Sequence, residues 1–180
     1  MEYTFSFYNR SAMQGTGAAL SRFLGEQSVP PVLVFVGTDL AIGDSLGPVA
    51  GTMAQQMIPR SDCFIYGTLA APMTAKEMKY MRKFIADTHP KSKVVVIDAA
   101  VGEVGDIGLI RVVDRPLAPG KGVNKALGSL GDISVMGIVS EKSVFNYSLM
   151  NLTRLGLVYK MAEIIAGGLT EAISSLRLSN

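Results

Sequence analysis

The sequence is poor in cysteine and histidine, with one residue of each among 180. A single cysteine cannot form an intramolecular disulfide, which fits a chain that stays in the cytoplasm. Cys63 lies in an apolar run, where a small buried hydrophobic residue is the ordinary expectation. A cysteine nucleophile needs a basic partner, and the one histidine, His89, precedes Pro90 at a predicted helix end. We therefore expect no Cys–His catalytic pair.

Long apolar runs and clustered charge are missing as well. Hydrophobic residues make up 48% of the chain, yet no stretch approaches the roughly 20 uninterrupted apolar residues of a membrane-spanning helix. The N-terminus lacks the pattern of a secretory signal. The net charge is +2 and the basic residues are scattered, so no stripe would follow a phosphate backbone. We expect a cytoplasmic protein that binds neither membranes nor nucleic acid.

What the sequence has is a regular succession of predicted strands and helices. Its length suits a single domain over residues 1–180, with residues 1–30 as a helical extension packed on it. A parallel sheet with crossover helices, an α/β fold, follows from the alternation. The predicted strands are 32–36, 62–69, 94–100, 107–113 (an edge strand or hairpin) and 133–139. The predicted helices are 48–58, 74–88 and 147–166, the last broken by Gly167-Gly168, and residues 116–131 are a predicted loop.

The spacing of large apolar residues predicts which helix faces are buried. For the helix 48–58 the predicted inner face is Val49, Met53 and Met57. For the helix 147–166 it is Leu149, Leu152, Leu155 and Tyr159.

The stretch 32–48 organises the chain. Five apolar residues end at Gly37, a loop rich in Gly, Asp, Thr and Ser follows, and Pro48 opens a helical pattern. Ligands of open parallel sheets bind beyond the carboxyl ends of the strands, so this loop holds the first candidate site residues. Asp98 ends the strand 94–100 in the same way, and Asp44 and Asp98 are expected to face one crevice.

Two other kinds of site fit this loop less well. The tetrapeptide Gly43-Asp44-Ser45-Leu46 matches the name motif of the GDSL esterases, but a serine nucleophile needs a histidine base, and no histidine follows His89. A phosphate site would need a Gly-x-Gly-x-x-Gly or Walker pattern, which is missing, and Asp39 and Asp44 would repel the anion. We expect no nucleotide cofactor.

The aspartate pair suits hydrolysis of an amide. Two carboxyls in one partly desolvated site cannot both ionise easily, so Asp44 and Asp98 would divide into an acid and a base. Two alternatives remain open at this point. The first is that the carboxylates hold a divalent metal, although a transition metal is usually bound by His or Cys as well. The second is that Asp98 simply caps a turn.

Several ordered motifs resemble the YyaC family of sporulation proteins, from about Pro31 to the C-terminus. They are Gly37-Thr38-Asp39, Gly43-Asp44-Ser45-Leu46-Gly47-Pro48, Tyr66-Gly67-Thr68-Leu69, Val96-Ile97-Asp98-Ala99, Gly131-Asp132-Ile133 and Gly137-Ile138-Val139. That family is similar in turn to the spore germination protease and to the hydrogenase maturation endopeptidases. The resemblance implies a three-layer α/β/α sandwich with a mostly parallel central sheet, of the hydrogenase maturation protease-like type.

The resemblance also implies site residues. Two aspartates are essential in the germination protease, and they correspond to Asp44 and Asp98. The hydrogenase proteases bind nickel with acidic residues at these two positions and a later histidine. Residues 116–131 contain no histidine, so we expect no metal and favour the spore-protease branch.

The expected function is therefore an aspartate-dependent endopeptidase or amidase of endospore formation or germination, acting on a protein or peptide in the cytoplasm of the sporulating cell or forespore. Asp44 and Asp98 would share a proton, with Thr38 and Ser45 orienting them. The other expected substrate-binding residues are Gly37, Asp39, Gly43, Gly67 and Thr68. A homo-oligomer is possible on this reading. The alternatives are a non-catalytic sporulation protein that binds a peptide or partner in the same crevice and, more weakly, a metal-dependent hydrolase.

Overall fold

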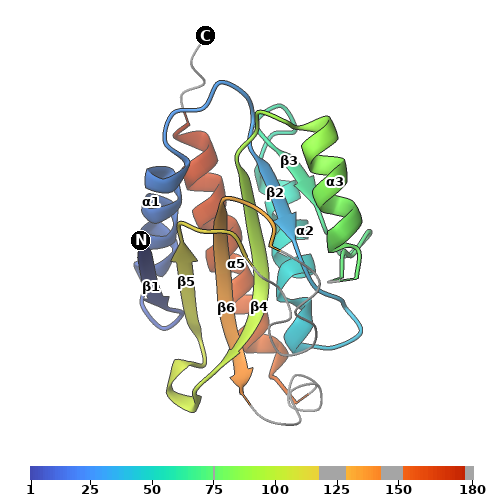
Figure 1. Ribbon diagram of the computed structural model, residues 1–180. Helices are drawn as coiled ribbons and strands as arrows, with labels where there is room; N and C mark the ends of the chain where they lie inside the picture. Colours follow the sequence, from blue (N-terminus) through green and yellow to red (C-terminus); the bar gives the residue numbers. More distant parts are fainter. Residues whose placement is uncertain (75, 118–128, 143–151, 177–180) are drawn as a thin grey trace.

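The computed structural model describes residues 1–74, 76–117, 129–142 and 152–176, and it has a six-stranded sheet covered by helices (Figure 1). The strands are β1 (Glu2–Ser6), β2 (Val32–Phe35), β3 (Phe64–Tyr66), β4 (Val94–Gly102), β5 (Leu109–Val113) and β6 (Ile133–Glu141). The helices are α1 (Ala12–Leu24), α2 (Leu46–Met57), α3 (Met78–Thr88) and α5 (Leu155–Ser174), with short 3-10 turns η1 (Gly43–Ser45) and η2 (Val104–Asp106).

The strands follow the order β1-β5-β6-β4-β2-β3 across the sheet. Strands β3, β2, β4 and β6 are parallel, and β5 is antiparallel to its neighbours β6 and β1. The carboxyl ends of the four parallel strands therefore meet at one edge of the sheet, the lower edge in Figure 1.

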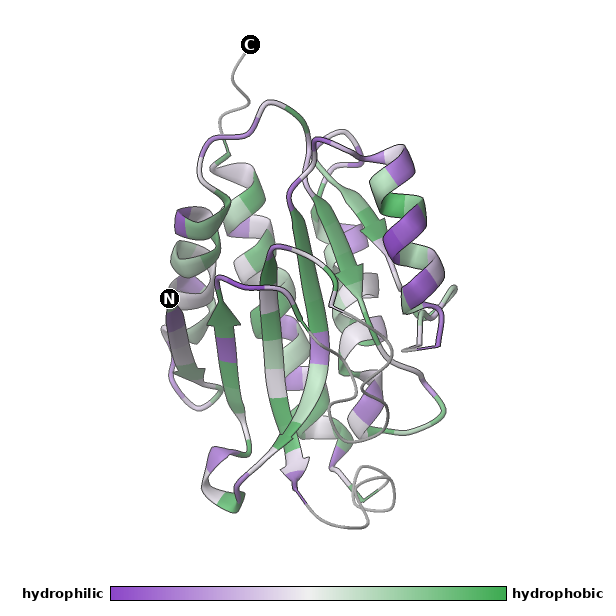
Figure 2. Ribbon diagram, viewed as in Figure 1, coloured by the Kyte–Doolittle hydropathy of each residue, from purple (hydrophilic) through white to green (hydrophobic). Residues whose placement is uncertain are grey.

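Both faces of the central strands are apolar, and this sets the layers (Figure 2). Leu33 and Phe35 belong to the core that includes buried residues of α1, α2 and α5. Val32 and Val34 point to the other face, where they share a core with residues of α3. The result is a three-layer α/β/α sandwich with a mostly parallel sheet, which confirms the predicted fold class.

The N-terminal residues differ from the prediction, because residues 1–30 contain a strand as well as the expected helix. β1 pairs with β5 from Glu2↔Val113 to Ser6↔Leu109. Its side chains alternate: Tyr3 and Phe5 pack on the core, and Glu2 and Thr4 are exposed. The predicted edge strand 107–113 is consequently not at the edge, since β1 covers it.

The predicted inner face of α2 is correct only in part. Val49 and Met53 are partly buried and pack against the core, but Met57 is 50% exposed. The buried face consists of small residues and the first turn of the helix: Leu46, Gly47, Pro48, Ala50, Gly51 and Ala54. A Cβ at Gly47 would lie 2.0 Å from the carbonyl oxygen of Val36, so α2 approaches the sheet more closely than large side chains allow.

The predicted inner face and the predicted break of the C-terminal helix are also wrong. Leu155 and Tyr159 are 56% and 50% exposed, and α5 buries Val158, Met161, Ala162 and Ile165 instead. The helix continues through Gly167-Gly168 to Ser174. A Cβ at Gly167 would lie 2.5 Å from the sulfur of Met13, so these glycines allow α1 and α5 to pack closely.

The other boundaries shift by a few residues. The predicted strand 62–69 and helix 74–88 are shorter, as β3 and α3, and the predicted strands 94–100 and 133–139 are longer, as β4 and β6. Most of the predicted loop 116–131, and residues 147–151 of the last predicted helix, lie outside the described residues. Within the described part of the chain, no helix is both long and apolar enough to span a bilayer.

Candidate functional site

The chain leaves the sheet after β2 at Gly37, and the geometry there requires glycine. Its φ of +140° disfavours other residues, and a Cβ would lie 2.1 Å from the carbonyl oxygen of Asp44. The N–H of Gly37 donates to the carbonyl of Met73 at 2.9 Å, and the N–H of Thr38 donates to the carbonyl of Asp44 at 3.1 Å. The loop is thereby folded back against its own end, which fixes Asp44 near the carboxyl end of β2.

The hydroxyl groups of the loop are used within the loop. Ser45 is buried, and its Oγ donates to the carbonyl of Ile42 at 2.7 Å. The Oγ1 of Thr38 accepts from the N–H of Leu40 at 3.2 Å. Ser45 therefore stabilises the turn, and it is the backbone N–H of Thr38, not its hydroxyl, that lowers the pKa of the Asp44 carboxyl.

Asp98 lies inside β4, one residue beyond the last pair with β2, which is Phe35↔Ile97. The prediction that Asp98 ends its strand is wrong, because β6 continues to pair with β4 from Asp98↔Met136 to Gly102↔Glu141. Asp98 nevertheless lies beside the carboxyl end of the shorter strand β2. The β2–α2 loop, which carries Asp44, begins at this same edge of the sheet.

The two aspartates influence each other's protonation. Burial raises the pKa of Asp98 well above its ordinary value, the charge of Asp44 raises it further, and the N–H of Ala99 opposes the shift. Burial also raises the pKa of Asp44, opposed by the N–H of Thr38. Both side chains are partly accessible to solvent. The structure thus brings together the two aspartates that the sequence singled out, and it favours protonation of Asp98 over that of Asp44.

A comparison with known protein families now identifies the chain. The family model described as "Protein of unknown function (DUF1256)" matches residues 4–168. The chain belongs to this family. This chain is also 40% identical to the uncharacterized protein YyaC of Bacillus subtilis (strain 168) over 141 residues, which cover 78% of this chain and 68% of YyaC. The resemblance to the YyaC family is confirmed.

The fold of this DUF1256 protein has a counterpart among solved structures. The [NiFe] hydrogenase maturation protease HycI from Thermococcus kodakarensis KOD1 matches with a TM-score of 0.60 over 87% of this chain and 99% of HycI. The sequences are 16% identical. At this level of identity the match shows the shared fold, which is the hydrogenase maturation protease-like type that the resemblance implied.

The remaining predicted substrate-binding residues of the DUF1256 protein lie at the same edge of the sheet but have different surroundings. Gly67 has a φ of +88°, and a Cβ there would lie 1.9 Å from the carbonyl oxygen of Phe35. Thr68 is buried. Gly43 is buried in η1, whereas Asp39 is exposed. Of these four, Asp39 has the side chain most open to solvent.

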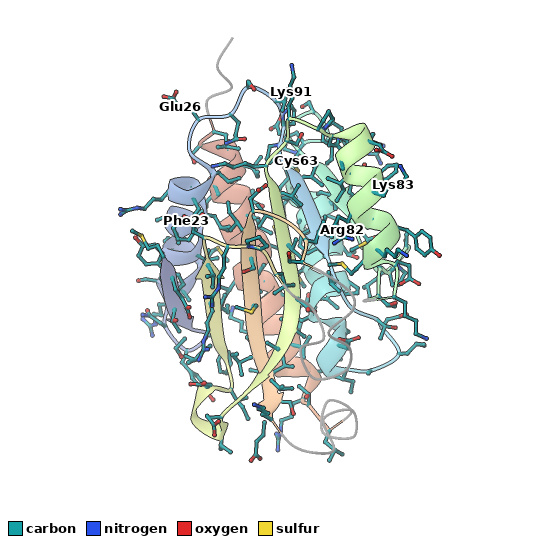
Figure 3. The ribbon with its side chains drawn as sticks, viewed as in Figure 1. Phe23, Glu26, Cys63, Arg82, Lys83 and Lys91 are labelled. Carbon is teal, nitrogen blue, oxygen red and sulfur yellow. The ribbon has the colours of Figure 1, made fainter. Side chains whose placement is uncertain are left out.

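The donors at the two aspartates do not fit a nickel ion. No cluster of three His, Cys, Asp or Glu residues occurs among the described residues. Cys63 lies just before β3, near the opposite edge of the sheet (Figure 3), and burial raises the pKa of its thiol to about 12. His89 Nε2 lies 2.8 Å from the hydroxyl of Tyr66. Two carboxyls without His or Cys are a poor donor set for nickel.

Two backbone donors at the candidate site had no signal in the sequence. The N–H donors of Thr38 and Ala99 belong to the backbone, so only the fold reveals them. Sequence reasoning also missed a separate hollow of about 680 Å³ that does not include the aspartates. It is lined by Phe7, Tyr8, Ile107, Val139, Arg154, Gly156 and Leu157.

Replacing Asp98 by asparagine is expected to stabilise the folded protein at neutral pH. The pKa of Asp98 is raised in the folded state, so the folded protein binds more protons than the unfolded chain between the ordinary and the raised pKa. The stability that this carboxyl contributes is fully present below the ordinary pKa and is lost as the pH rises through the raised one. Thermal unfolding at several pH values measures the effect: Asp98→Asn should have the higher Tm at neutral pH, and its advantage should shrink in acid. A Tm difference that does not change with pH would contradict the raised pKa.

Proposed function

We propose that this protein is a peptidase that hydrolyses a peptide bond of a protein substrate with Asp44 and Asp98. The observation that carries the proposal is the interaction of two partly buried carboxyls, one of which has a pKa raised both by burial and by the charge of the other. A pair of acidic groups whose environments push their pKa values apart is the arrangement that acid–base catalysis needs. The protease-like fold supports the same chemistry.

The two residues have different roles in this proposal. Asp44, as carboxylate, takes a proton from a water molecule, whose oxygen then bonds to the carbonyl carbon of the substrate. Asp98, as carboxylic acid, gives its proton to the carbonyl oxygen. When the tetrahedral intermediate breaks, the C–N bond cleaves, the leaving nitrogen takes the proton from Asp44, and a hydroxyl group returns one to Asp98. Both residues regain their starting protonation states.

The biological setting we propose is the formation or germination of endospores, in the cytoplasm of the sporulating cell or the forespore. The kinship with the YyaC family supports this setting, and the 40% identity to YyaC over most of the chain makes that kinship close. The substrate would then be a protein present in the developing or germinating spore.

The pH dependence of cleavage tests the assigned roles. The rate should rise as the pH increases through the pKa of Asp44, which must be ionised, and fall as the pH increases through the higher pKa of Asp98, which must be protonated. The assay incubates the protein with spore protein extract and counts newly formed amino termini over time at each pH. A rate that does not change as Asp98 titrates would contradict its role as the acid. A complete lack of new amino termini would favour the non-catalytic, peptide-binding alternative.

A further inference from the structure

Strand β4 is longer than its neighbour β2, so part of one of its edges pairs with no strand among the described residues. The pairing with β2 ends at Phe35↔Ile97, whereas β4 continues to Gly102. After Val36 the neighbouring chain turns away toward the β3 side, where the N–H of Gly37 donates to Met73. Among the residues that the structure describes, no strand pairs with β4 on this side beyond Ile97.

Two hydrogen bonds establish which backbone groups of β4 face the unpaired side. The carbonyl of Ile97 accepts from Val36 N–H at 2.8 Å, on the β2 side, and the carbonyl of Gly102 accepts from Lys142 N–H at 2.7 Å, on the β6 side. Successive residues of a strand direct their backbone groups to opposite sides. The register with β6 shifts by one residue between Ala100 and Val101, but Ala99 alternates from Ile97 and Val101 from Gly102, so both face the β2 side. The N–H of Ala99 lies close enough to the carboxyl of Asp98 to lower its pKa. The N–H of Val101 and the carbonyls of Ala99 and Val101 therefore point toward the space beyond β2.

Within the described parts of the chain, this edge lacks the protection found at the outer edges of the sheet. Proteins usually block exposed strand edges with charge, short strands or covering segments. At one outer edge, Glu2 of β1 forms ion pairs with Arg111 and Arg115 at 3.9 and 3.8 Å. At the other edge, β3 has three residues. By contrast, residues 99–101 are uncharged and partly accessible, and they follow directly after Asp98.

We propose that an extended segment of the protein substrate pairs with the free edge of β4 at Ala99 and Val101 and so becomes an added strand beside the two aspartates. This inference rests on the proposed peptidase function and names how the substrate is held. Strand addition uses the backbone of the peptide for affinity. It would place the backbone of the bound segment next to Asp98, where a peptide bond can meet both carboxyls.

The geometry favours a peptide segment over a second copy of this chain as the occupant. The free edge is short and begins where β2 ends at Phe35, and only Ala99 and Val101 direct backbone groups to it. An edge strand of a folded domain brings its flanking strands and helices with it, whereas an extended segment needs only the width of one strand. The substrate class is therefore a protein with an unfolded or locally extended stretch.

A binding experiment tests this independently of cleavage. A displayed library of randomised linear peptides is selected on the full-length Asp98→Asn protein, and the affinity of a selected peptide is then measured with each of its backbone nitrogens methylated in turn. A peptide that pairs as a strand should lose about threefold to tenfold in affinity at every second position and little at the positions between. Uniform or irregular losses, or the selection of no peptide, would overturn the proposal.

A variant of the protein provides the reciprocal test. Val101→Pro removes the N–H that faces the free edge, which proline tolerates in an edge position. This variant should keep a Tm near that of the wild type, and its affinity for the peptide should be lower by a similar threefold to tenfold. Ala100→Pro is the matched comparison: its N–H faces β6, so it should lower the Tm instead. Unchanged affinity in folded Val101→Pro would overturn the proposal, and if this variant does not fold, the methylation pattern decides. Strand-like binding without cleavage would leave this inference standing and contradict the peptidase function alone.

Discussion

Asp98→Asn is expected to lower the rate of peptide cleavage by about 10² to 10⁴, the usual loss when a positioned general acid is removed. Asparagine has nearly the shape of aspartic acid but has no proton of comparable acidity to give to the carbonyl oxygen. Asp44→Asn should cause a loss of similar size, because the amide cannot take a proton from water. The double variant should be little worse than either single variant, since the two residues act as one unit.

The measurement compares initial rates of cleavage in spore protein extract by wild-type and variant proteins at the same concentration. Asp87→Asn is the matched control: it makes the same chemical change at an exposed aspartate of α3 that pairs with Lys83, and it should cleave at the wild-type rate. Because Asp98→Asn is also expected to raise the Tm at neutral pH, loss of folding would not explain its inactivity. Wild-type cleavage by folded Asp44→Asn and Asp98→Asn would refute the proposed mechanism.

The sequence was sufficient to predict the fold class and to select the two aspartates, for a common physical reason. Strands buried on both faces read as continuous apolar runs, and residues 32–36 and 94–97 have this pattern. Once these runs are assigned to parallel strands, the polar residues that follow them must lie at one edge of the sheet. Asp44 and Asp98 could therefore be placed near each other without any knowledge of their distance.

The helix faces could not be predicted in the same way, because large apolar residues do not always mark the buried side. In α2 Gly47 lies against the backbone of Val36, and in α5 Gly167 lies against the side chain of Met13, so a larger residue at either position would require a neighbour to move. In a sequence, a glycine within a helical pattern indicates a less stable helix or a helix end. The close packing that requires the glycine is visible only in the three-dimensional structure. This is why Gly167-Gly168 was wrongly predicted to break the helix.

The candidate site, too, could be predicted from the sequence only in part. Its hydrogen bonds to Asp44 and Asp98 come from the backbone of Thr38 and Ala99, which any residue other than proline could supply. The free edge of β4 exists because β2 ends earlier than β4, and strand ends are the least reliable part of a sequence-based assignment. The sequence was sufficient to predict the chemistry of the two aspartate side chains, but the shape of the space around them could not be predicted from it.

The close approach of α2 to the sheet leads to the largest effect that we expect on stability, in Gly47→Ala. Two effects oppose each other. Alanine favours a helix over glycine by up to about 1 kcal/mol. A Cβ at this position would, however, lie 2.0 Å from the carbonyl oxygen of Val36 and 2.8 Å from its carbonyl carbon. The backbone of Val36 is hydrogen-bonded to Ile97 of β4, so it cannot move aside as a flexible side chain could. The collision should prevail, and the free energy of unfolding should fall by about 2 kcal/mol or more.

Gly156→Ala is the control that separates these two effects. Gly156 is also a helical glycine, near the start of α5, but it is exposed and nothing lies within 4 Å of the position of its missing Cβ. Its replacement should leave the free energy of unfolding unchanged or raise it by up to about 1 kcal/mol. Urea unfolding of the two variants and the wild type measures the difference. Because α2 begins directly after η1, Gly47→Ala should also displace Asp44 relative to Asp98 and slow cleavage in the protein that remains folded. If Gly47→Ala is as stable as Gly156→Ala, the tight contact between α2 and β2 does not hold Asp44 in place, and another part of the β2–α2 loop must do so.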